Sequence, residues 1–312
     1  MIKKRSIKVI SPASVSNVGP GFDILGFPLD VNSDIIELKI TDKKELRITE
    51  ILPTELGISK DPVKNTAGKS LAEMMNAIKF PYGIELKITK EIGIGTGLGS
   101  SAASAVGAVY AFNQLLENPL EVNELIKFAL AGEAVASGSI HGDNVIPCML
   151  GGFILVRNAE ELEYTKIDFP DNLICLVIKP DVVINTKAAR EVLPKEYSRN
   201  ILTEQSVNIA SLISGFMKGD YDLIKKSVKD KVAEPYRKKL IPFYDEIKNL
   251  VELSDSYGFS ISGSGPTLFA FYKDQDLAHK IGLNAVSFYN SKNIKSDYYV
   301  SKINITGPKV IP

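Results

Sequence analysis

Two kinds of hydrophobic periodicity run along the chain and predict a mixture of strands and helices. The segment 83–90, GIELKITK, alternates apolar and polar residues strictly, which is the pattern of a half-buried strand. The segment 173–178 is continuously apolar, which indicates a strand buried on both faces. In the segment 122–137 the apolar residues recur every three or four positions, which predicts a helix with one buried face.

The same criteria, together with turn-forming residues, divide most of the chain into elements. Because strand runs and helix runs are mixed without a steady strand–helix alternation, the pattern favours an α+β fold. Long and short loops are expected at 11–26 and 139–144, and Gly258 is expected to cap the helix before it. Strands are predicted at 6–10, 35–48, 83–90, 151–156, 173–178, 259–261, 267–271 and 296–305, and helices at 100–116, 122–137, 188–193, 201–217, 221–231, 243–257 and 277–290.

The length of the chain favours two packed lobes. Its 312 residues exceed the roughly 100–200 residues of a typical domain. The composition turns acidic and polar around residues 157–171, so the boundary is predicted there, with an N-terminal lobe at 1–160 and a C-terminal lobe at 161–312.

Composition and charge exclude several classes of protein. The 37 basic and 37 acidic residues give a formal net charge of zero, which argues against a nucleic-acid-coating or membrane-surface protein. No apolar run approaches the roughly 18 residues of a membrane span, and the basic N-terminus is not followed by a signal-peptide core. Cys148 and Cys175 both lie in apolar runs, so we expect buried thiols and a cytoplasmic location.

The most informative segment is glycine-rich and lies between a predicted strand and a predicted helix. In 93–101, GIGTGLGSS, glycine occupies every second position up to Gly99. Glycines allow close approach of the backbone, and the start of a helix presents unpaired N–H groups that attract phosphate oxygens. The segment lacks the lysine of a P-loop, and Ser100 stands where a dinucleotide-binding motif needs glycine. The alternative is a turn whose glycines serve close packing only.

Glu133 interrupts the apolar face of the helix predicted at 122–137. It lies four residues after Ala129 and three after Leu130. A buried carboxylate needs a cation, and Mg²⁺ accepts a carboxylate, a serine hydroxyl and nucleotide phosphates as ligands. The alternative is a glutamate at a helix end that reaches solvent or pairs with a lysine.

Three segments in order resemble the motifs of the GHMP kinase superfamily. Residues 12–26, PASVSNVGPGFDILG, are similar to its first motif in the form found in homoserine kinases. Residues 95–101 are similar to the second motif, with Gly93 where a proline is usual, and 260–267 resemble the third. The resemblance implies a two-lobed α+β fold, with an N-terminal lobe like ribosomal protein S5 domain 2 and a ferredoxin-like C-terminal α/β sandwich.

The resemblance also implies an activity, namely ATP-dependent phosphorylation of the hydroxyl of L-homoserine in threonine biosynthesis. It implies a homodimer and no nucleic-acid or membrane partner. Ser101 and Glu133 become the expected Mg²⁺ ligands. The residues expected to bind ATP are Gly93, Gly95, Thr96, Gly97, Leu98, Gly99, Ser100 and Ser101.

An acceptor pocket is expected around the predicted loop 139–144. Taken alone, its His-Gly-Asp sequence is usually just a turn. An aspartate suits the ammonium group of an amino acid, and guanidinium groups suit its carboxylate. Thr186 is expected to cap the helix that carries Arg190. The residues that the resemblance places in this pocket are Asn17, Asp23, His141, Asp143, Asn144, Thr186, Arg190, Arg237 and Gly263.

The residue types also suggest how the reaction proceeds. Asn144 occupies the place where mevalonate kinase-like relatives have an aspartate, and a carboxamide cannot hold a proton. We therefore expect no side-chain base, with Asn144 or Asp143 orienting the hydroxyl and Ser101 holding the metal, because phosphoryl transfer depends mostly on positioning and charge neutralisation. The alternatives are a kinase of the superfamily that acts on mevalonate-, sugar- or shikimate-type alcohols, and a sensor without catalysis.

Overall fold

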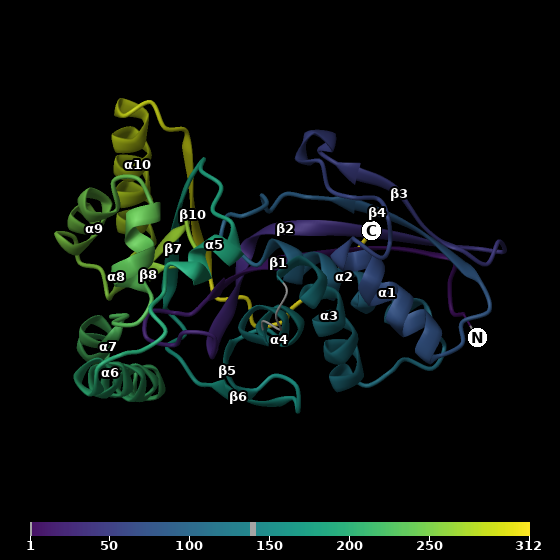
Figure 1. The fold of residues 1–312 in the computed structure, drawn as a ribbon, viewed down its shortest axis with the longest axis horizontal. Coiled ribbons are helices and arrows are strands. Elements are labelled where there is room, and N and C mark those ends of the chain that lie inside the picture. Colours follow the sequence, from purple (N-terminus) through teal and green to yellow (C-terminus); the bar gives the residue numbers. More distant parts are fainter. Residues whose placement is uncertain (1, 138–141) are drawn as a thin grey trace.

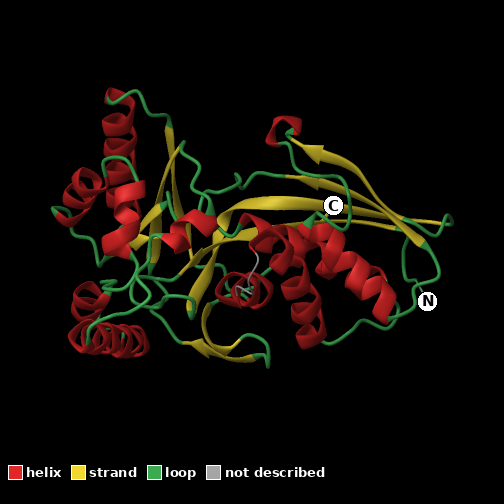
Figure 2. Cartoon of the chain, in the orientation of Figure 1, coloured by secondary structure: helices red, strands yellow, loops and turns green. Residues whose placement is uncertain are grey.

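The computed structural model describes residues 2–137 and 142–312 and has two lobes side by side (Figures 1 and 2). The sheet of the first lobe has the strand order β11-β1-β2-β4-β3, and β5 extends it from β2 and carries β6. The pairs are antiparallel except β3 with β4, which run parallel. These strands are β1 (Ser6–Ser16), β2 (Leu25–Thr41), β3 (Leu46–Leu52), β4 (Gly83–Thr89), β5 (Phe153–Asn158), β6 (Glu163–Ile167) and β11 (Lys309–Ile311).

Helices lie on one side of this sheet (Figure 1). They are α1 (Thr66–Ala77), α2 (Ser100–Leu115), α3 (Val122–Ser137) and α4 (Gly142–Leu150). Small residues fill α2, so it packs closely against β1, β2, α1 and α3 and is buried over most of its length. The short helix η1 (Thr54–Leu56) follows β3. This packing fixes the start of α2, which follows directly from the glycine-rich loop.

The second lobe is a four-stranded antiparallel sheet with the order β10-β7-β9-β8, which is the ferredoxin-like order. One face of this sheet has its own core, which includes Leu176, Leu268 and Tyr289, whereas Val177 and Phe271 on the other face join the core of the first lobe. The strands are β7 (Ile174–Pro180), β8 (Phe259–Ile261), β9 (Leu268–Tyr272) and β10 (Ser296–Lys302), and the helices are α5 (Thr186–Glu191), α6 (Arg199–Lys218), α7 (Tyr221–Ser227), α8 (Glu234–Arg237), η2 (Lys238–Leu240), α9 (Tyr244–Glu252) and α10 (Gln275–Ser291).

Aromatic side chains join the two lobes. Phe27 of β2 stacks on Phe153 of β5 with ring centroids 4.5 Å apart and on Phe271 of β9 at 5.8 Å. Phe216 of α6 completes the cluster at 4.6 Å from Phe153. Such pairs contribute beyond their buried area, so the cluster holds the lobes in one orientation. Two strands that follow residue 160 belong to the sheet of the first lobe, because β6 pairs with β5 and β11 pairs with β1. The boundary at residue 160 stays a prediction.

The α+β class and most elements are confirmed, with differences around the motifs. The predicted loop 11–26 is wrong for its first part, because β1 continues to Ser16 with its serines buried. The predictions missed α1, whose N-cap is the side chain of Asn65, and α4, which contains Pro147. Asp143 and Asn144 therefore lie on a helix and not in a loop. The prediction that Gly258 caps α9 is wrong, since that helix ends at Glu252.

Both cysteines are buried free thiols, as predicted. Within 2–137 and 142–312, no helix combines the length and the apolar character that crossing a membrane requires.

Candidate active site

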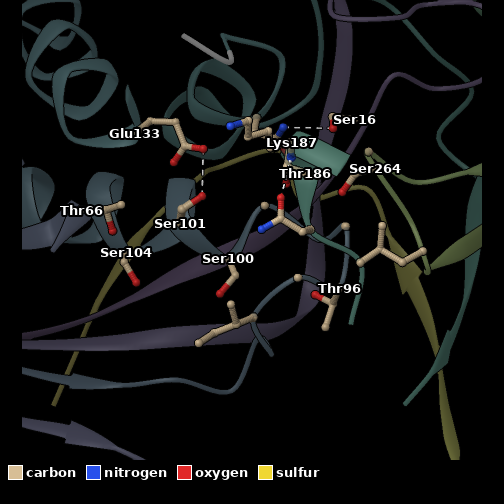
Figure 3. A pocket seen from close by; sticks show the side chains of 18 of the residues that line it. Ser16, Thr66, Thr96, Ser100, Ser101, Ser104, Glu133, Thr186, Lys187 and Ser264 are labelled. Carbon is tan, nitrogen blue, oxygen red and sulfur yellow. Dashed lines mark hydrogen bonds between the residues drawn. The ribbon is translucent and has the colours of Figure 1, made fainter. Parts of the chain in front are cut away.

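A cavity of about 600 Å³ lies between the lobes, within the usual range of ligand pockets (Figure 3). Gly93 and Leu98 do not line it, and the Leu98 side chain is buried in the core. His141 lies outside the described residues. The other residues predicted for the site all line the cavity: Asn17, Asp23, Gly95, Thr96, Gly97, Gly99, Ser100, Ser101, Glu133, Asp143, Asn144, Thr186, Arg190, Arg237 and Gly263.

Glycines of the loop are required both by backbone angles and by close packing. Gly97 and Gly99 have positive φ values of 78° and 62°. A Cβ on Gly97 would lie 2.4 Å from the carbonyl oxygen of Ser262, and one on Gly99 would lie 2.1 Å from Oγ of Ser14. Close packing is therefore one role of these two glycines. It does not replace the phosphate-binding interpretation, because the start of α2 lines the cavity.

Hydrogen bonds connect the three motifs into one unit. The N–H of Ser14 donates to the carbonyl of Leu98 at 3.1 Å, and the hydroxyl of Ser262 donates to the carbonyl of Gly97 at 2.6 Å. The N–H of Gly263 closes the triangle by donating to the carbonyl of Ser16 at 3.1 Å. The glycine-rich loop is thus held between the first motif and the third.

The two serines at the start of α2 have different partners. The N-cap of α2 is Gly99, and no side chain caps this helix. The hydroxyl of Ser100 donates to the carbonyl of Ile92 at 3.0 Å. The hydroxyl of Ser101 donates to Oε1 of Glu133 at 2.8 Å. Ser101 and Glu133 therefore place two oxygen atoms side by side at the helix start, where they could serve as ligands of a metal ion.

Glu133 is buried, with only 4 % of its surface exposed, so the alternative of a solvent-exposed glutamate is wrong. Burial raises the pKa of Glu133 to about 7, and the negative charge of Asp143 acts in the same direction. The hydrogen bond from Ser101 and the charge of Lys90 oppose this shift. A carboxyl group with a pKa near 7 can lose its proton near neutral pH, and its carboxylate could then serve as a metal ligand.

Opposite charges face each other on the acceptor side of the cavity. Nη2 of Arg190 donates to both carboxylate oxygens of Asp23, at 2.8 and 2.9 Å. Arg237 is buried and donates to the carbonyls of Ala189 at 3.0 Å and Gly263 at 2.8 Å. Burial and the neighbouring Arg190 lower the pKa of Arg237. Both guanidinium groups lie over the ring of Phe22, at 5.6 and 5.1 Å from its centre.

The two asparagines predicted for the site are held by the motifs. Asn17 has a positive φ of 68°; its amide donates to the carbonyl of Gly263 at 2.8 Å and accepts from the N–H of Asp23 at 3.0 Å. The amide oxygen of Asn144 accepts from Ser14 at 2.9 Å, and its nitrogen donates to Ser16 at 3.0 Å. The orientation of Asn144 is therefore fixed by two serines of β1.

Asp143 lies beside Asn144 in the first turn of α4 and is 1 % exposed. Burial raises its pKa to about 7, with the charge of Asp23 acting in the same direction. The backbone N–H of Asn17 and the charge of Arg190 oppose the shift. Oδ1 of Asp143 has no hydrogen-bond partner among the described residues, which leaves it available to a ligand.

Thr186 lies in the cavity wall, but it does not cap α5. The cap is Asn185, whose side chain accepts from the N–H groups of Lys187 and Ala188 at 2.8 and 3.3 Å. The expectation for Thr186 is wrong because the helix begins at Thr186 itself, one residue earlier than a Thr186 cap requires.

Comparisons with known proteins agree with this geometry. Residues 65–152 match the family model of the GHMP kinases N terminal domain, and residues 212–291 match that of the GHMP kinases C terminal. A homoserine kinase of Chlorobium phaeobacteroides (strain BS1) is 35 % identical, over 98 % of this chain and 100 % of the relative. The chain belongs to the homoserine kinase family, within the GHMP kinases.

Solved structures extend this comparison. The crystal structure of homoserine kinase from Cytophaga hutchinsonii shares 44 % identity with a TM-score of 0.96 and covers 99 % of this chain and 98 % of that one. L. major mevalonate kinase in complex with R-mevalonate has a TM-score of 0.76 at 15 % identity, over 97 % and 98 % of the two chains, which shows a common fold only. The two-lobed fold predicted from the motifs is that of the homoserine kinases.

Sequence reasoning missed several residues that line the cavity. Lys90 lies at the end of β4 and binds Asp34 of β2 in the core. Asp34 and Lys90 each occupy a position on the apolar face of a strand that alternates apolar and polar residues. A charged residue at such a position is the signal in the sequence that could have identified the pair. The segment 64–66 before and at the start of α1 also lines the cavity, and it was missed because α1 was not predicted.

Proposed function

We propose that this chain transfers the terminal phosphoryl group of ATP to the side-chain hydroxyl of L-homoserine and releases O-phospho-L-homoserine and ADP. The observation that carries the proposal is one cavity that combines a phosphate-binding helix start with groups for both charges of an amino acid. Membership of the homoserine kinase family supports the same conclusion.

The nucleotide phosphates would bind at the start of α2. The first N–H groups of a helix lack intrahelical acceptors, and the positive end of the helix dipole favours anions. Ile94 of the loop and Ile58 line the same cavity and would offer apolar surface to the purine. Together these features orient ATP with its terminal phosphate toward Asn144.

Ser101 and Glu133 fit a magnesium ion that accompanies ATP. Mg²⁺ binds few protein oxygens and completes its shell with phosphates and water. Residues 2–137 and 142–312 contain no cluster of three or more His, Cys, Asp or Glu side chains arranged for a metal. When bound, the ion would neutralise charge on the phosphates. The chain's own contribution is to hold the Ser101 hydroxyl and the Glu133 carboxylate 2.8 Å apart.

The amino-acid end of the acceptor would bind between Asp23, Arg190 and Arg237. Its ammonium would face Asp23, with Asp143 assisting, and its carboxylate would accept from the guanidinium groups. In the structure Asp23 and Arg190 bind each other. The zwitterion would thus exchange one internal ion pair for two contacts with the substrate.

The transfer itself would need positioning and charge neutralisation more than a base. Asn144 is held by Ser14 and Ser16 and would orient the acceptor hydroxyl. The hydroxyl oxygen would form the new bond to phosphorus as the bond to the ADP oxygen breaks. The hydroxyl proton would then pass to the transferred phosphate.

A coupled assay of ADP release with a panel of alcohols tests the proposal. We expect release with L-homoserine and ATP but not with mevalonate or galactose. Release with mevalonate or galactose alone would favour another kinase of the superfamily, and nucleotide binding without release on any alcohol would favour a sensor. Assembly into a homodimer is a further proposal, which sedimentation of the purified chain would test.

A further inference from the structure

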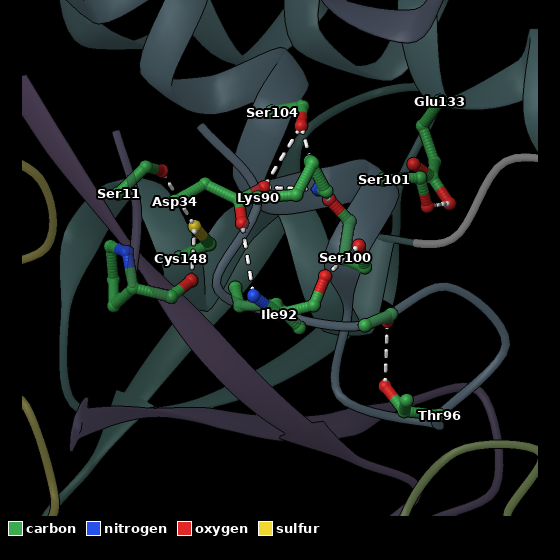
Figure 4. Close-up of polar contacts among 12 residues, drawn as sticks. Ser11, Asp34, Lys90, Ile92, Thr96, Ser100, Ser101, Ser104, Glu133 and Cys148 are labelled. Carbon is green, nitrogen blue, oxygen red and sulfur yellow. Dashed lines mark hydrogen bonds and ion pairs between the residues drawn. The ribbon is translucent and has the colours of Figure 1, made fainter. Parts of the chain in front are cut away.

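A buried ion pair lies directly behind the glycine-rich loop (Figure 4). The ammonium of Lys90, at the end of β4, binds the carboxylate of Asp34 on β2. The two side chains are 3 % and 0 % exposed. Burial raises the pKa of Asp34, and the positive charge of Lys90 opposes the rise.

The hydrogen bonds of this pair reach both ends of the loop. At one end, the N–H of Ile92 donates to Oδ1 of Asp34 at 3.2 Å. At the other end, the ammonium of Lys90 donates to the carbonyl of Ser100 at 2.7 Å. The hydroxyl of Ser100 then donates back to the carbonyl of Ile92 at 3.0 Å, which joins the two ends directly.

Ser104, one turn further along α2, completes the network. Its hydroxyl lies 2.9 Å from the carboxylate of Asp34 and 2.9 Å from the ammonium of Lys90. A lysine ammonium has three protons, and here they face Asp34, Ser100 and Ser104. Unlike the lysine of a P-loop, Lys90 has therefore committed its donors to the protein and not to a phosphate.

Stability does not explain an ion pair at this place. Asp34 lies on β2, between β1 and β4, and the next residues on the same face are apolar and buried, namely Ile36 and Leu38. Removing two charges from water costs about as much as their attraction returns, so apolar side chains would serve the core as well. What apolar side chains cannot do is hold the N–H of Ile92 and the carbonyl of Ser100 in fixed positions.

We propose that Asp34 and Lys90 are positioning residues that fix both ends of the phosphate-binding loop, residues 91–99, in its binding shape before ATP arrives. The inference rests on the proposed function, because it takes the loop as the ATP site. Preorganisation lowers the free-energy cost of ordering a loop on binding. Loss of the ion pair should therefore weaken the binding of ATP and leave the acceptor site unchanged.

Three variants test the proposal against one matched control. Asp34→Asn retains Lys90 but removes its counter-charge. Lys90→Met leaves a buried carboxylate unpaired and is therefore made also as the double variant Asp34→Leu/Lys90→Met, which restores an apolar core. The control is Lys87→Met, which removes a lysine from the same strand, where it pairs with Glu50 in a partly exposed position.

We expect the double variant to unfold at a temperature close to that of the parent. Its KM for ATP should rise about tenfold or more, with the KM for L-homoserine within about twofold of the parent value. Asp34→Asn should raise the KM for ATP in the same direction, and Lys87→Met should leave it unchanged. A folded double variant with the parent KM for ATP would overturn the proposal. So would Asp34→Asn with unchanged or tighter ATP binding, because Lys90 would then act on the nucleotide directly.

Calorimetric titration with Mg-ATP in the absence of acceptor separates this inference from the proposed function. If the parent binds Mg-ATP but phosphorylates no homoserine, the proposed acceptor is wrong. The affinities of the parent and the variants for Mg-ATP still decide whether the ion pair organises the loop.

Discussion

The hydroxyl of Ser101, in the first turn of α2, donates a 2.8 Å hydrogen bond to the carboxylate of Glu133 on α3. The two side chains come from neighbouring helices and meet at the wall of the cavity, beside the helix start that would bind phosphate. A buried carboxylate is stable in such a place only when it is protonated or paired with a cation. From this relationship we predict that Glu133 responds both to magnesium and to pH.

The variant Glu133→Gln should lose most activity while remaining folded. An amide has nearly the shape of the carboxylate and can still accept from Ser101, but it lacks the negative charge that a magnesium ion needs. We expect kcat to fall about 100-fold and the magnesium requirement to rise. Activity measured over a magnesium titration checks this. The control is Glu124→Gln at the exposed start of the same helix, and equal losses in both variants would rule out a metal role for Glu133.

Stability of the ligand-free protein should depend on Glu133 between pH 4.5 and pH 7. Burial raises the pKa of this carboxyl from 4.5 to about 7 in the folded state. The folded state thus holds the proton more tightly, so the stability from this group is complete below pH 4.5 and is lost as the pH rises through about 7.

Glu133→Gln is neutral at every pH and should escape this loss. Its free energy of unfolding relative to the parent should increase across that window, by roughly 3 kcal/mol as an upper limit. Urea unfolding at a series of pH values, without nucleotide or divalent cation, measures the difference. A difference that stays constant with pH would mean that Glu133 is not protonated on folding.

The sequence predicts the parts of this site that lie in local motifs. The segment 93–101 combines its glycines with a following helix, so the motif can be recognised from residues that are neighbours in the chain. Glu133 was placed on the buried face by helical spacing alone, because position on a regular helix follows from counting residues.

The rest of the site depends on contacts between distant segments. Asp23 and Arg190 are 167 residues apart, and no local pattern indicates that they bind each other. The pair of Asp34 and Lys90 likewise forms across two strands that are adjacent only in the folded sheet. α4 was missed because Pro147 within it and the glycines on either side suggest turns, whereas packing against β1, β2 and β5 stabilises the helix.

Removing the guanidinium of Arg190 should weaken the binding of the amino acid and not the binding of the nucleotide. In Arg190→Ala the acceptor carboxylate loses a charged hydrogen-bond donor, so we expect the KM for L-homoserine to rise about 10- to 100-fold. The KM for ATP should change little. Arg199→Ala, at the exposed start of α6, removes the same charge outside the cavity and serves as the control. A rise confined to the KM for ATP would assign Arg190 to the phosphates.

The variant Asp143→Asn tests whether the reaction needs a side-chain base. In the parent chain the Asp143 carboxyl has a pKa of about 7, which would suit a base. Its place beside Asp23 and Arg190, however, suits binding of the substrate ammonium group. We expect a higher KM for L-homoserine and a fall in kcat of no more than about 100-fold, with the pH dependence of kcat retained. Initial rates from acidic to alkaline pH check this. A loss of many orders of magnitude, together with disappearance of a titration in kcat, would identify Asp143 as the base.

Gly99→Ala should abolish ATP binding because the new methyl group would clash with Ser14 and Asn144. This effect adds to the strain of an alanine with positive φ. Gly99 has φ 62° and ψ 32°, and a Cβ there would lie 2.1 Å from Oγ of Ser14 and 2.8 Å from Oδ1 of Asn144. Gly57, the cap of η1, has φ 62° and ψ 22° with nothing within 4 Å of a Cβ. Gly57→Ala should therefore cost only about 1 kcal/mol of stability and leave ATP binding intact.

Gly99→Ala should cost roughly 1–3 kcal/mol more, because Ser14 and Asn144 must shift, and it should remove detectable Mg-ATP binding by calorimetry. Equal effects of the two substitutions on unfolding and on Mg-ATP affinity would show that backbone strain alone explains the glycine.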